Sequence, residues 1–254
     1  MHPPSVIKFD HITKAFGTHK VLDDLSLDIP AGKITFILGK SGEGKSVTIK
    51  HIMGLLRPDS GKIFVNGVEI THFDEMQFRK YRANFGMLFQ HAALFDSLTV
   101  GENVIFPLQE HTKMALPAML RRVEDVLTQA GLPNIQHKYP SELSTGEKKR
   151  VGLARALVAS PKIMLYDEPT TGMDPLVAEM IDELIVEVNK IQKEMTSIVI
   201  SHDLKAALAT AENIIMLYKG RVALAGTPAE FRASKDPIIR QFFSGKVDGP
   251  MEFF

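Results

Sequence analysis

Eight residues from Gly39 to Ser46 read Gly-Lys-Ser-Gly-Glu-Gly-Lys-Ser, a pattern whose residue types can hold a polyphosphate. The glycines at 39, 42 and 44 let the backbone turn its N–H groups inward, and a helix that follows adds the positive end of its dipole. From this loop the Lys45 ammonium can reach the β- and γ-phosphates, and the Ser46 hydroxyl can be a ligand of Mg²⁺. We therefore predict a nucleoside triphosphate site.

The residues on either side of the loop support this prediction. Ile34–Leu38 is an apolar run typical of a strand, and Val47–Leu56 has the apolar spacing of a helix. The loop thus lies where a strand turns into a helix, which is the context that the pattern requires. A glycine-rich turn that matches by accident is the alternative, and the motif by itself leaves ATP and GTP both open.

Two carboxylates follow a second apolar run. Ile163–Tyr166 predicts a buried strand, and Asp167 and Glu168 stand at its carboxyl end. In α/β sheets this end faces the ligand crevice, so Asp167 can hold Mg²⁺ through water while Glu168 polarises an attacking water. The alternative is a pair of solvated turn residues.

A second helix start lies at Leu143–Glu147, ahead of a helical run to Ala159. Ser144 and Thr145 are candidates for its N-cap, and Gly146 lies at its mouth. A simply capped helix is one interpretation. The functional interpretation is a second helix N-terminus that binds an anion.

Three single residues could complete the nucleotide site. Phe16 could stack on a base or belong to the core. Gln90, which follows the strand-like run 85–89, could orient a water, bind Mg²⁺ or be a solvated amide. His202 follows the apolar run 196–201 and could contact the γ-phosphate or be ordinary polar surface.

Composition limits the class of protein. The chain has 254 residues, 44% of them hydrophobic, which is enough for a well-buried core. Lys plus Arg and Asp plus Glu are 30 each, so no overall charge attracts nucleic acid, and we expect no nucleic-acid partner. The absence of cysteine excludes disulfides and cysteine-ligated metals. No apolar run reaches the roughly 18 residues of a membrane span, and the start lacks a signal peptide, so we expect a cytoplasmic protein.

The order of patterns predicts an α/β fold in which a mixed sheet carries an antiparallel β subdomain and an inserted helical subdomain. Asn66-Gly67 predicts a hairpin over 62–70, and a final hairpin is expected over 214–225. We expect one domain over 1–243, with the helical subdomain at about 91–159, and an extended tail over 244–254. Further strands are expected at 6–9 and 25–29, and helices at 74–81, 115–130, 148–159 and 175–193.

Taken together, the motifs resemble the ATP-binding cassette of ABC transporters, a class of P-loop NTPase, over almost the whole chain. The resemblance implies that Phe16 stacks on adenine, Glu168 is the general base and His202 is the switch histidine. It implies an ATP site made of Phe16, Gly39, Ser41, Gly42, Gly44, Lys45, Ser46, Val47, Ser144, Gly146 and Asp174. Mg²⁺ would be bound by Ser46, Gln90 and Asp167, and catalysis would depend on Lys45, Gln90, Glu168 and His202.

The same resemblance implies a homodimer, in which Ser144 and Gly146 of one copy close on the ATP that the other copy's phosphate loop holds. Three residues depart from the family pattern. Thr145 stands where the family has glycine, Glu147 where it usually has Gln, and Val47 where it usually has Thr. We expect closure to be weaker or more regulated, and hydrolysis to survive.

Residues 88–108 look like the Mla and Mce type of cassette, and residues 241–253 are similar to the tail of MlaF-like subunits, which suggests that the tail grips a neighbouring subunit. This likeness implies an ATPase on the cytoplasmic face of the inner membrane that drives an MlaE-like permease docked on 91–142. Phospholipid or another hydrophobic lipid would be the cargo, with an Mce-domain protein and small accessory subunits as further partners. The alternatives are an importer ATPase for a different solute, an envelope-signalling ATPase without cargo, and a regulatory nucleotide binder without turnover.

Overall fold

The apolar run before the phosphate loop is strand β3 (Ile34–Leu38), and all of its residues are buried. The computed structural model that shows this describes residues 4–245 and 248–251. The chain divides into two units, one made of the residues up to Asp74 and from Ile200 onward, the other of Glu75–Val199. Strand β8 (Thr196–Ser201) runs from the second unit into the first.

The first unit contains the phosphate loop, an antiparallel sheet and the end of the chain. Its strands and helices are β1 (Ser5–Phe16), β2 (His19–Pro30), β3, α1 (Lys45–Ile52), β4 (Ser60–Val65), β5 (Val68–Glu69), α7 (Leu204–Thr210), β9 (Asn213–Tyr218), β10 (Arg221–Gly226), α8 (Pro228–Ala233) and α9 (Pro237–Ser244).

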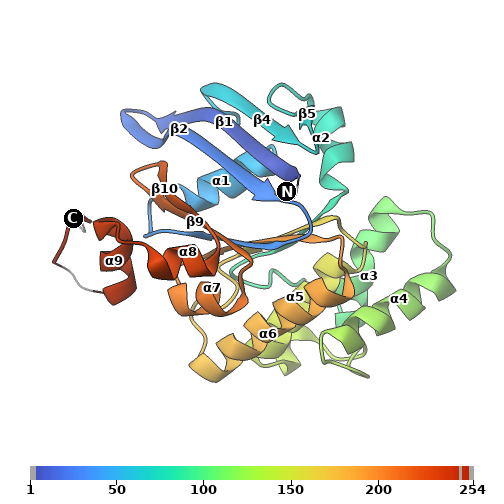
Figure 1. Ribbon diagram of the computed structural model, residues 1–254. Helices are drawn as coiled ribbons and strands as arrows, with labels where there is room; N and C mark the ends of the chain where they lie inside the picture. The colour runs from blue at the N-terminus through green and yellow to red at the C-terminus, as the bar shows by residue number, and fades with distance from the viewer. Residues whose placement is uncertain (1–3, 246–247, 252–254) are drawn as a thin grey trace. The chain divides into compact units, whose positions relative to one another are not determined.

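Two kinds of strand pairing occur in this unit. The order β2-β1-β4-β5 is antiparallel throughout, whereas β9 pairs with β3 in parallel and with β10 in antiparallel (Figure 1). The hairpin predicted at Asn66-Gly67 is the β4–β5 turn, where both residues have positive φ. The mixed α/β fold class is therefore confirmed, including the antiparallel piece.

The second unit contains most of the helices. Its elements are α2 (Glu75–Arg82), β6 (Phe85–Leu88), α3 (Val100–His111), α4 (Leu116–Gln129), a short 3₁₀ turn (Pro140–Glu142), α5 (Thr145–Leu157), β7 (Ile163–Asp167) and α6 (Pro175–Ile191). Helices α3, α4 and α5 pack against one another, and β6 pairs with β7 in parallel (Figure 1). The helical region expected from His91 begins only at Val100, because residues 91–99 form a loop.

That loop is held by one buried amide. Asn103 on α3 has no exposed surface, and its Oδ1 accepts a hydrogen bond from Phe95 N at 2.8 Å. Its Nδ2 donates to the carbonyl oxygens of Phe95, Leu98 and Thr99 at 3.0 to 3.1 Å. A single side chain therefore satisfies backbone groups that a helix or strand would otherwise pair.

Side-chain caps begin most of the later helices. Asp174 accepts from Leu176 N and Val177 N ahead of Pro175, the first residue of α6. Thr99 and Glu102 form a capping box on α3, and Thr227 and Glu230 form another on α8. These local signals fix helix starts that the apolar spacing alone leaves uncertain.

Residues 248–251 fold back on α9. Gln241 is buried, its Oε1 accepts from Met251 N at 2.6 Å, and Met251 is 2% exposed. Tyr218 Oη also donates to the Pro250 carbonyl oxygen at 3.3 Å. The two terminal aromatics of the expected tail, at 253 and 254, lie outside the described residues.

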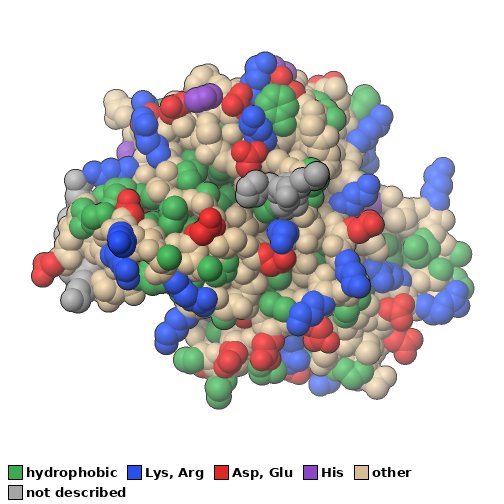
Figure 2. Space-filling model, in the orientation of Figure 1, with side chains coloured by type: hydrophobic (Ala, Val, Ile, Leu, Met, Phe, Trp, Pro, Cys, Tyr) green, Lys and Arg blue, Asp and Glu red, His purple; other side chains and the backbone are tan. Residues whose placement is uncertain are grey.

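Acidic and basic side chains are interspersed over the visible face in Figure 2, as the equal numbers of the two charges suggest. No helix in the described part of the chain has both the length and the apolarity needed to cross a bilayer.

We expect Asn103→Ala to lower the free energy of unfolding by about 1–3 kcal/mol, because the half-buried Phe95 N–H and Leu98 carbonyl oxygen lose the side chain that binds them. The carbonyl oxygens of Phe95 and Thr99 keep their backbone hydrogen bonds. Asn103→Asp should cost more, since a carboxylate would face three carbonyl oxygens. Urea denaturation followed by circular dichroism measures both. Asn84→Ala removes an exposed amide that bonds one carbonyl, and it serves as the control. Equal losses at positions 84 and 103 would contradict the assignment.

Candidate functional site

The phosphate loop depends on two glycines for its shape. Gly39 and Gly44 have φ of 155° and 91°. A Cβ at Gly39 would lie 2.8 Å from the Leu217 carbonyl oxygen, and one at Gly44 would lie 2.5 Å from Leu22 Cδ2. Only glycine fits both positions without moving the neighbouring strands.

Lys45 begins α1 and is 5% exposed. Its ammonium donates hydrogen bonds to the carbonyl oxygens of Gly39 at 2.7 Å and Lys40 at 2.9 Å. The charge therefore lies within the curve of the loop, where phosphate oxygens of a nucleotide can replace carbonyl oxygens as its partners. Ser46 is exposed and Val47 half-buried, one on each side of the first helical turn.

Ser41 and Gly42 are exposed at the tip of the loop. The sequence reasoning missed Glu43, whose carboxylate accepts a hydrogen bond from Lys219 N in the β9–β10 turn. These two residues are 176 positions apart, so no local pattern pointed to the contact. The bond ties the loop to the hairpin that also approaches Gly39.

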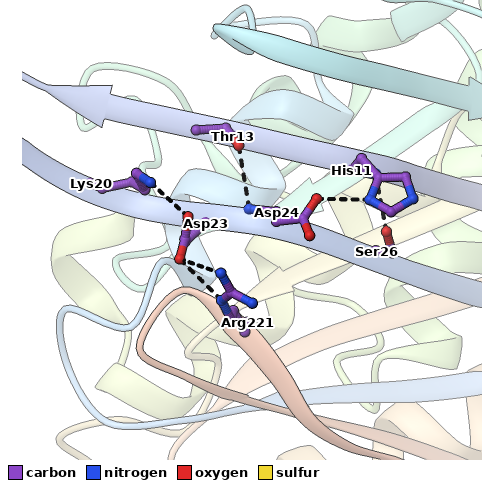
Figure 3. A network of polar contacts seen from close by, with 7 residues as sticks. All are labelled: His11, Thr13, Lys20, Asp23, Asp24, Ser26 and Arg221. Atoms are coloured by element: carbon purple, nitrogen blue, oxygen red, sulfur yellow. Dashed lines mark hydrogen bonds and ion pairs between the residues drawn. The ribbon is translucent and has the colours of Figure 1, made fainter.

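Phe16 lies at the β1–β2 turn and is 48% exposed, so the alternative of a core aromatic is wrong. A cluster of charges joins this hairpin to β10, as Figure 3 shows. Asp23 accepts from Arg221 at 2.7 and 3.0 Å and from Lys20 at 2.8 Å, and its N–H donates to the Gly220 carbonyl oxygen. Lys20 first, and then Arg221, hold the pKa of Asp23 below its ordinary value.

A bulge in the same hairpin is stabilised by local polar contacts. His11 and Asp24 both have positive φ, and His11 Nδ1 lies 2.7 Å from Asp24 Oδ1 (Figure 3). His11 N donates to Ser26 Oγ, and Asp24 N donates to Thr13 Oγ1. In this way the irregular part of the strand pair keeps its backbone donors satisfied. His202, the remaining predicted residue of the first unit, is exposed directly after β8.

In the second unit, Asp167 ends β7 and Glu168 follows it, both half-buried. Glu168 has a φ of 46°, which is uncommon for a residue other than glycine, Asn or Asp. Its Oε2 accepts a hydrogen bond from Thr171 Oγ1 at 2.9 Å. A strained backbone combined with a held carboxylate is typical of residues placed for a function.

Three of the predicted residues line one cavity of about 370 Å³ within the second unit: Ser144, Gly146 and Asp174. A Cβ at Gly146 would lie 3.0 Å from Val177 Cγ1, so the glycine keeps α5 close to α6. The structure thus brings the start of α5 and the loop before α6 together around a common space. Thr145, the departure from the family pattern, is exposed there.

Ser144 is the N-cap of α5, and Glu147 completes a capping box with it. Glu147 Oε2 accepts from Ser144 Oγ at 2.7 Å and from Ser144 N at 2.8 Å, while Glu147 N donates to Ser144 Oγ at 3.3 Å. These bonds, the hydroxyl first, lower the pKa of the Glu147 carboxyl. The Glu147 departure therefore has a structural function, because its carboxylate orients Ser144.

Gln90 is exposed shortly after the end of β6. A buried residue that contacts the segment around Gln90 was not predicted from the sequence. Lys149 on α5 is 3% exposed and donates to the Phe89 carbonyl oxygen at 3.0 Å. The helical spacing could have indicated this burial, because Lys149, Leu153 and Leu157 recur every four residues on the apolar face of α5.

The residues present fit ATP and Mg²⁺. The phosphate loop leaves no room for a Cβ at Gly39 or Gly44, and the Lys45 ammonium lies inside its curve. Such a loop suits a polyphosphate. Oxygen is the donor that Mg²⁺ prefers, and it is offered by the hydroxyl of Ser46 in the first unit and by the carboxylate of Asp167 and the amide of Gln90 in the second.

Comparison with known sequences agrees with this assignment. The family described as ABC transporter matches residues 22–171. A probable ribonucleotide transport ATP-binding protein, mkl, of Mycobacterium leprae is 38% identical over 96% of this chain and 70% of that protein. The phospholipid transport ATP-binding protein MlaF of Escherichia coli K12 is 36% identical over 93% and 88%. The Arabidopsis thaliana chloroplast protein TRIGALACTOSYLDIACYLGLYCEROL 3 is 34% identical over 98% and 76%.

Solved structures give the same result. The protein cbiO1 of Clostridium perfringens, part of the ABC transporter complex cbiONQ, has a TM-score of 0.84 at 31% identity, covering 93% of this chain and 94% of that one. The cassette MJ0796, solved as a dimer bound to ADP and Pi, has a TM-score of 0.78 at 30% identity, covering 87% and 98%.

We expect the Glu147 carboxyl to titrate below 4.5, and Ser144→Ala to move its pKa back up, because the hydroxyl is the largest cause of the shift. The folded pKa is the lower one, so the stabilising effect of the cap is present at neutral pH and is lost as the pH falls through that pKa. Carbon-13 NMR of labelled Glu147, compared between the wild type and Ser144→Ala, measures the titration. An unchanged Glu147 pKa in Ser144→Ala would contradict the capping box.

Proposed function

We propose, since the chain belongs to the ABC transporter family, that two copies of it close around two ATP molecules and drive a membrane permease. The chain is an ATP-hydrolysing cassette of this family, with the fold of its solved members. The dimer and the coupling to a permease are our proposal.

One observation supports the proposed dimer. The chain has two helix N-termini suited to phosphate, at α1 beside Lys45 and at α5 beside Ser144, and they belong to different units. A dimer in which α5 of one copy meets the loop of the other would give every ATP both sets of donors. The dimeric state of the similar cassette MJ0796 supports this arrangement.

The residues then have separate tasks. Lys45 binds the β- and γ-phosphates, Glu168 orients and deprotonates the attacking water, and His202 contacts the γ-phosphate. Ser46, Gln90 and Asp167 would hold Mg²⁺, which would neutralise phosphate charge. ATP shifts the equilibrium toward the closed dimer only through its stronger binding there, and Ser144 and Gly146 of the second copy supply that difference.

The permease is proposed to dock on residues 91–142, at the cytoplasmic face of the inner membrane. Seven large apolar side chains are exposed in or beside this segment: Phe89, Phe95, Phe106, Met114, Leu116, Leu120 and Tyr139. Exposed apolar groups gathered in one segment favour a protein contact. An MlaE-like permease, with Mce-domain and small accessory subunits, is the partner that the MlaF likeness suggests.

Phospholipid or another hydrophobic lipid is the proposed cargo, because MlaF is named for intermembrane phospholipid transport. A second candidate is a nucleotide, since mkl is named for ribonucleotide transport. The two differ in the permease pathway, which this chain does not contain.

Mixed dimers test whether each ATP pocket is formed by residues of both copies. One copy carries Lys45→Ala and the other Ser144→Asp, a change that keeps an N-cap residue but places a carboxylate toward the phosphates. If the pockets are shared between copies, both changes fall in one pocket and the other stays intact, so ATP hydrolysis persists. Mixed dimers with both changes in one copy and none in the other should be inactive.

Two affinity tags select the mixed dimers, and phosphate release measures the rate. Glu168→Gln in both copies is the reference for lost hydrolysis, with kcat lower by about 10²- to 10⁴-fold. The reverse pattern between the two mixed dimers would show that each copy forms its own pocket.

The cargo is tested by purifying the chain together with the membrane protein that it retains and identifying the bound molecules by mass spectrometry. We expect phospholipid, and we expect vesicles of that lipid to raise ATP hydrolysis above the rate in detergent. Retention of ribonucleotide at the permease, with no response to lipid, would favour the second candidate.

A further inference from the structure

The segment that follows Gln90 is held on α5 by cationic side chains. Lys149 Nζ donates to the Phe89 carbonyl oxygen at 3.0 Å. Arg155 donates to the carbonyl oxygens of Ala92 and Ala93, each at 2.8 Å. Three backbone acceptors on both sides of Gln90 are thus bonded to two residues of one helix.

Donating such a hydrogen bond from Lys149 requires desolvation of a charged ammonium, which is unfavourable. An ammonium that is 3% exposed has lost most of its hydration, and this burial lowers its pKa to about 8, while the charge of Asp167 opposes the change. An apolar side chain would fit the stripe formed by Leu153 and Leu157 at less cost. The lysine therefore does something that packing alone does not require.

The loop also lies directly on the helix surface. A Cβ at Gly152 would lie 3.1 Å from Leu88 Cδ1 and 3.3 Å from Ala92 Cβ. Ala93 has a φ of 49°, so the segment adopts a strained turn to reach Arg155. Close contact on one side and cationic donors at both ends leave this segment little freedom to move apart from α5.

We propose that Lys149 and Arg155 are positioning residues that lock the Gln90 segment to α5, so that Gln90 and Ser144 move as one body. Lys149 lies five residues after Ser144, or about 8 Å along the helix axis. A displacement of the segment by a docked partner is then transmitted to the start of α5. This inference rests on the proposed function, in which Ser144 acts on ATP.

The test compares Lys149→Met with Lys148→Met, which removes the neighbouring, more exposed lysine of the same helix. In full-length Lys149→Met, hydrogen exchange should rise together in residues 89–95 and 144–148. The kcat for ATP should fall by about 10- to 100-fold through misplacement, with KM within about twofold. Lys149→Arg should restore most of the rate, and Lys148→Met should change neither measurement.

Gly152→Ala is the second variant, because its methyl group presses on Ala92 without changing any charge. It should give the same paired rise in exchange, and it replaces Lys149→Met if that variant does not fold. A rise confined to 89–95, or an unchanged kcat after the segment has loosened, would overturn the proposal. Wild-type protein that hydrolyses no ATP would refute the proposed function instead, while the exchange comparison would still decide whether the lock exists.

Discussion

Backbone N–H groups at the start of a helix need acceptors, and this chain meets that need in two opposite ways. Within the described residues no side chain caps α1, whose start at Gly44 lies in the left-handed region. Its donors are therefore kept for a phosphate, with the Lys45 ammonium beside them. At α5 the Ser144 hydroxyl and the Glu147 carboxylate already occupy the first donors. The start of α1 is thus left open to polyphosphate, whereas the start of α5 is closed by its own side chains.

The Glu147 departure can be understood from this contrast. A hydroxyl has one proton to donate, and in this structure Ser144 directs it to Glu147 at 2.7 Å. In the proposed dimer, a phosphate oxygen held by the second copy would compete with that carboxylate, whose negative charge would lie near the incoming anion. Closure would then be opposed by one specific hydrogen bond, and the same bond keeps the Ser144 hydroxyl ordered in the separate subunit. The hydrogen bond from Ser144 to Glu147 therefore has both effects: it orders the hydroxyl, and it would oppose closure of the proposed dimer.

Local chemistry made much of this structure predictable. Asn66-Gly67 fixed a hairpin, Pro175 fixed the start of a helix, and the glycine spacing fixed the phosphate loop, because each depends on residues adjacent in the chain. The features that were not predicted from the sequence depend on residues far apart in the chain. The exposure of Phe16 is set by where its hairpin packs, and the Glu43 contact joins positions 176 apart. The positive φ of Glu168 has no signature in its residue type. Lys149 was overlooked because a lysine on a helix is usually solvent-facing.

The way the Gln90 segment is held bears on how such a loop can transmit motion. Apolar packing would allow it to slide, because dispersion contacts have no strong direction. Hydrogen bonds from Lys149 and Arg155 to carbonyl oxygens are directional and charge-assisted, so they fix the path of the backbone itself. These bonds use only the main chain of the loop, and the Arg155 guanidinium in addition lies 6.0 Å from the centre of the Phe95 ring. Phe89 and Phe95 can then remain exposed for a partner while the backbone between them stays tied to α5. In the proposed complex, this division would let the side chains contact the permease while the main chain passes the displacement to α5.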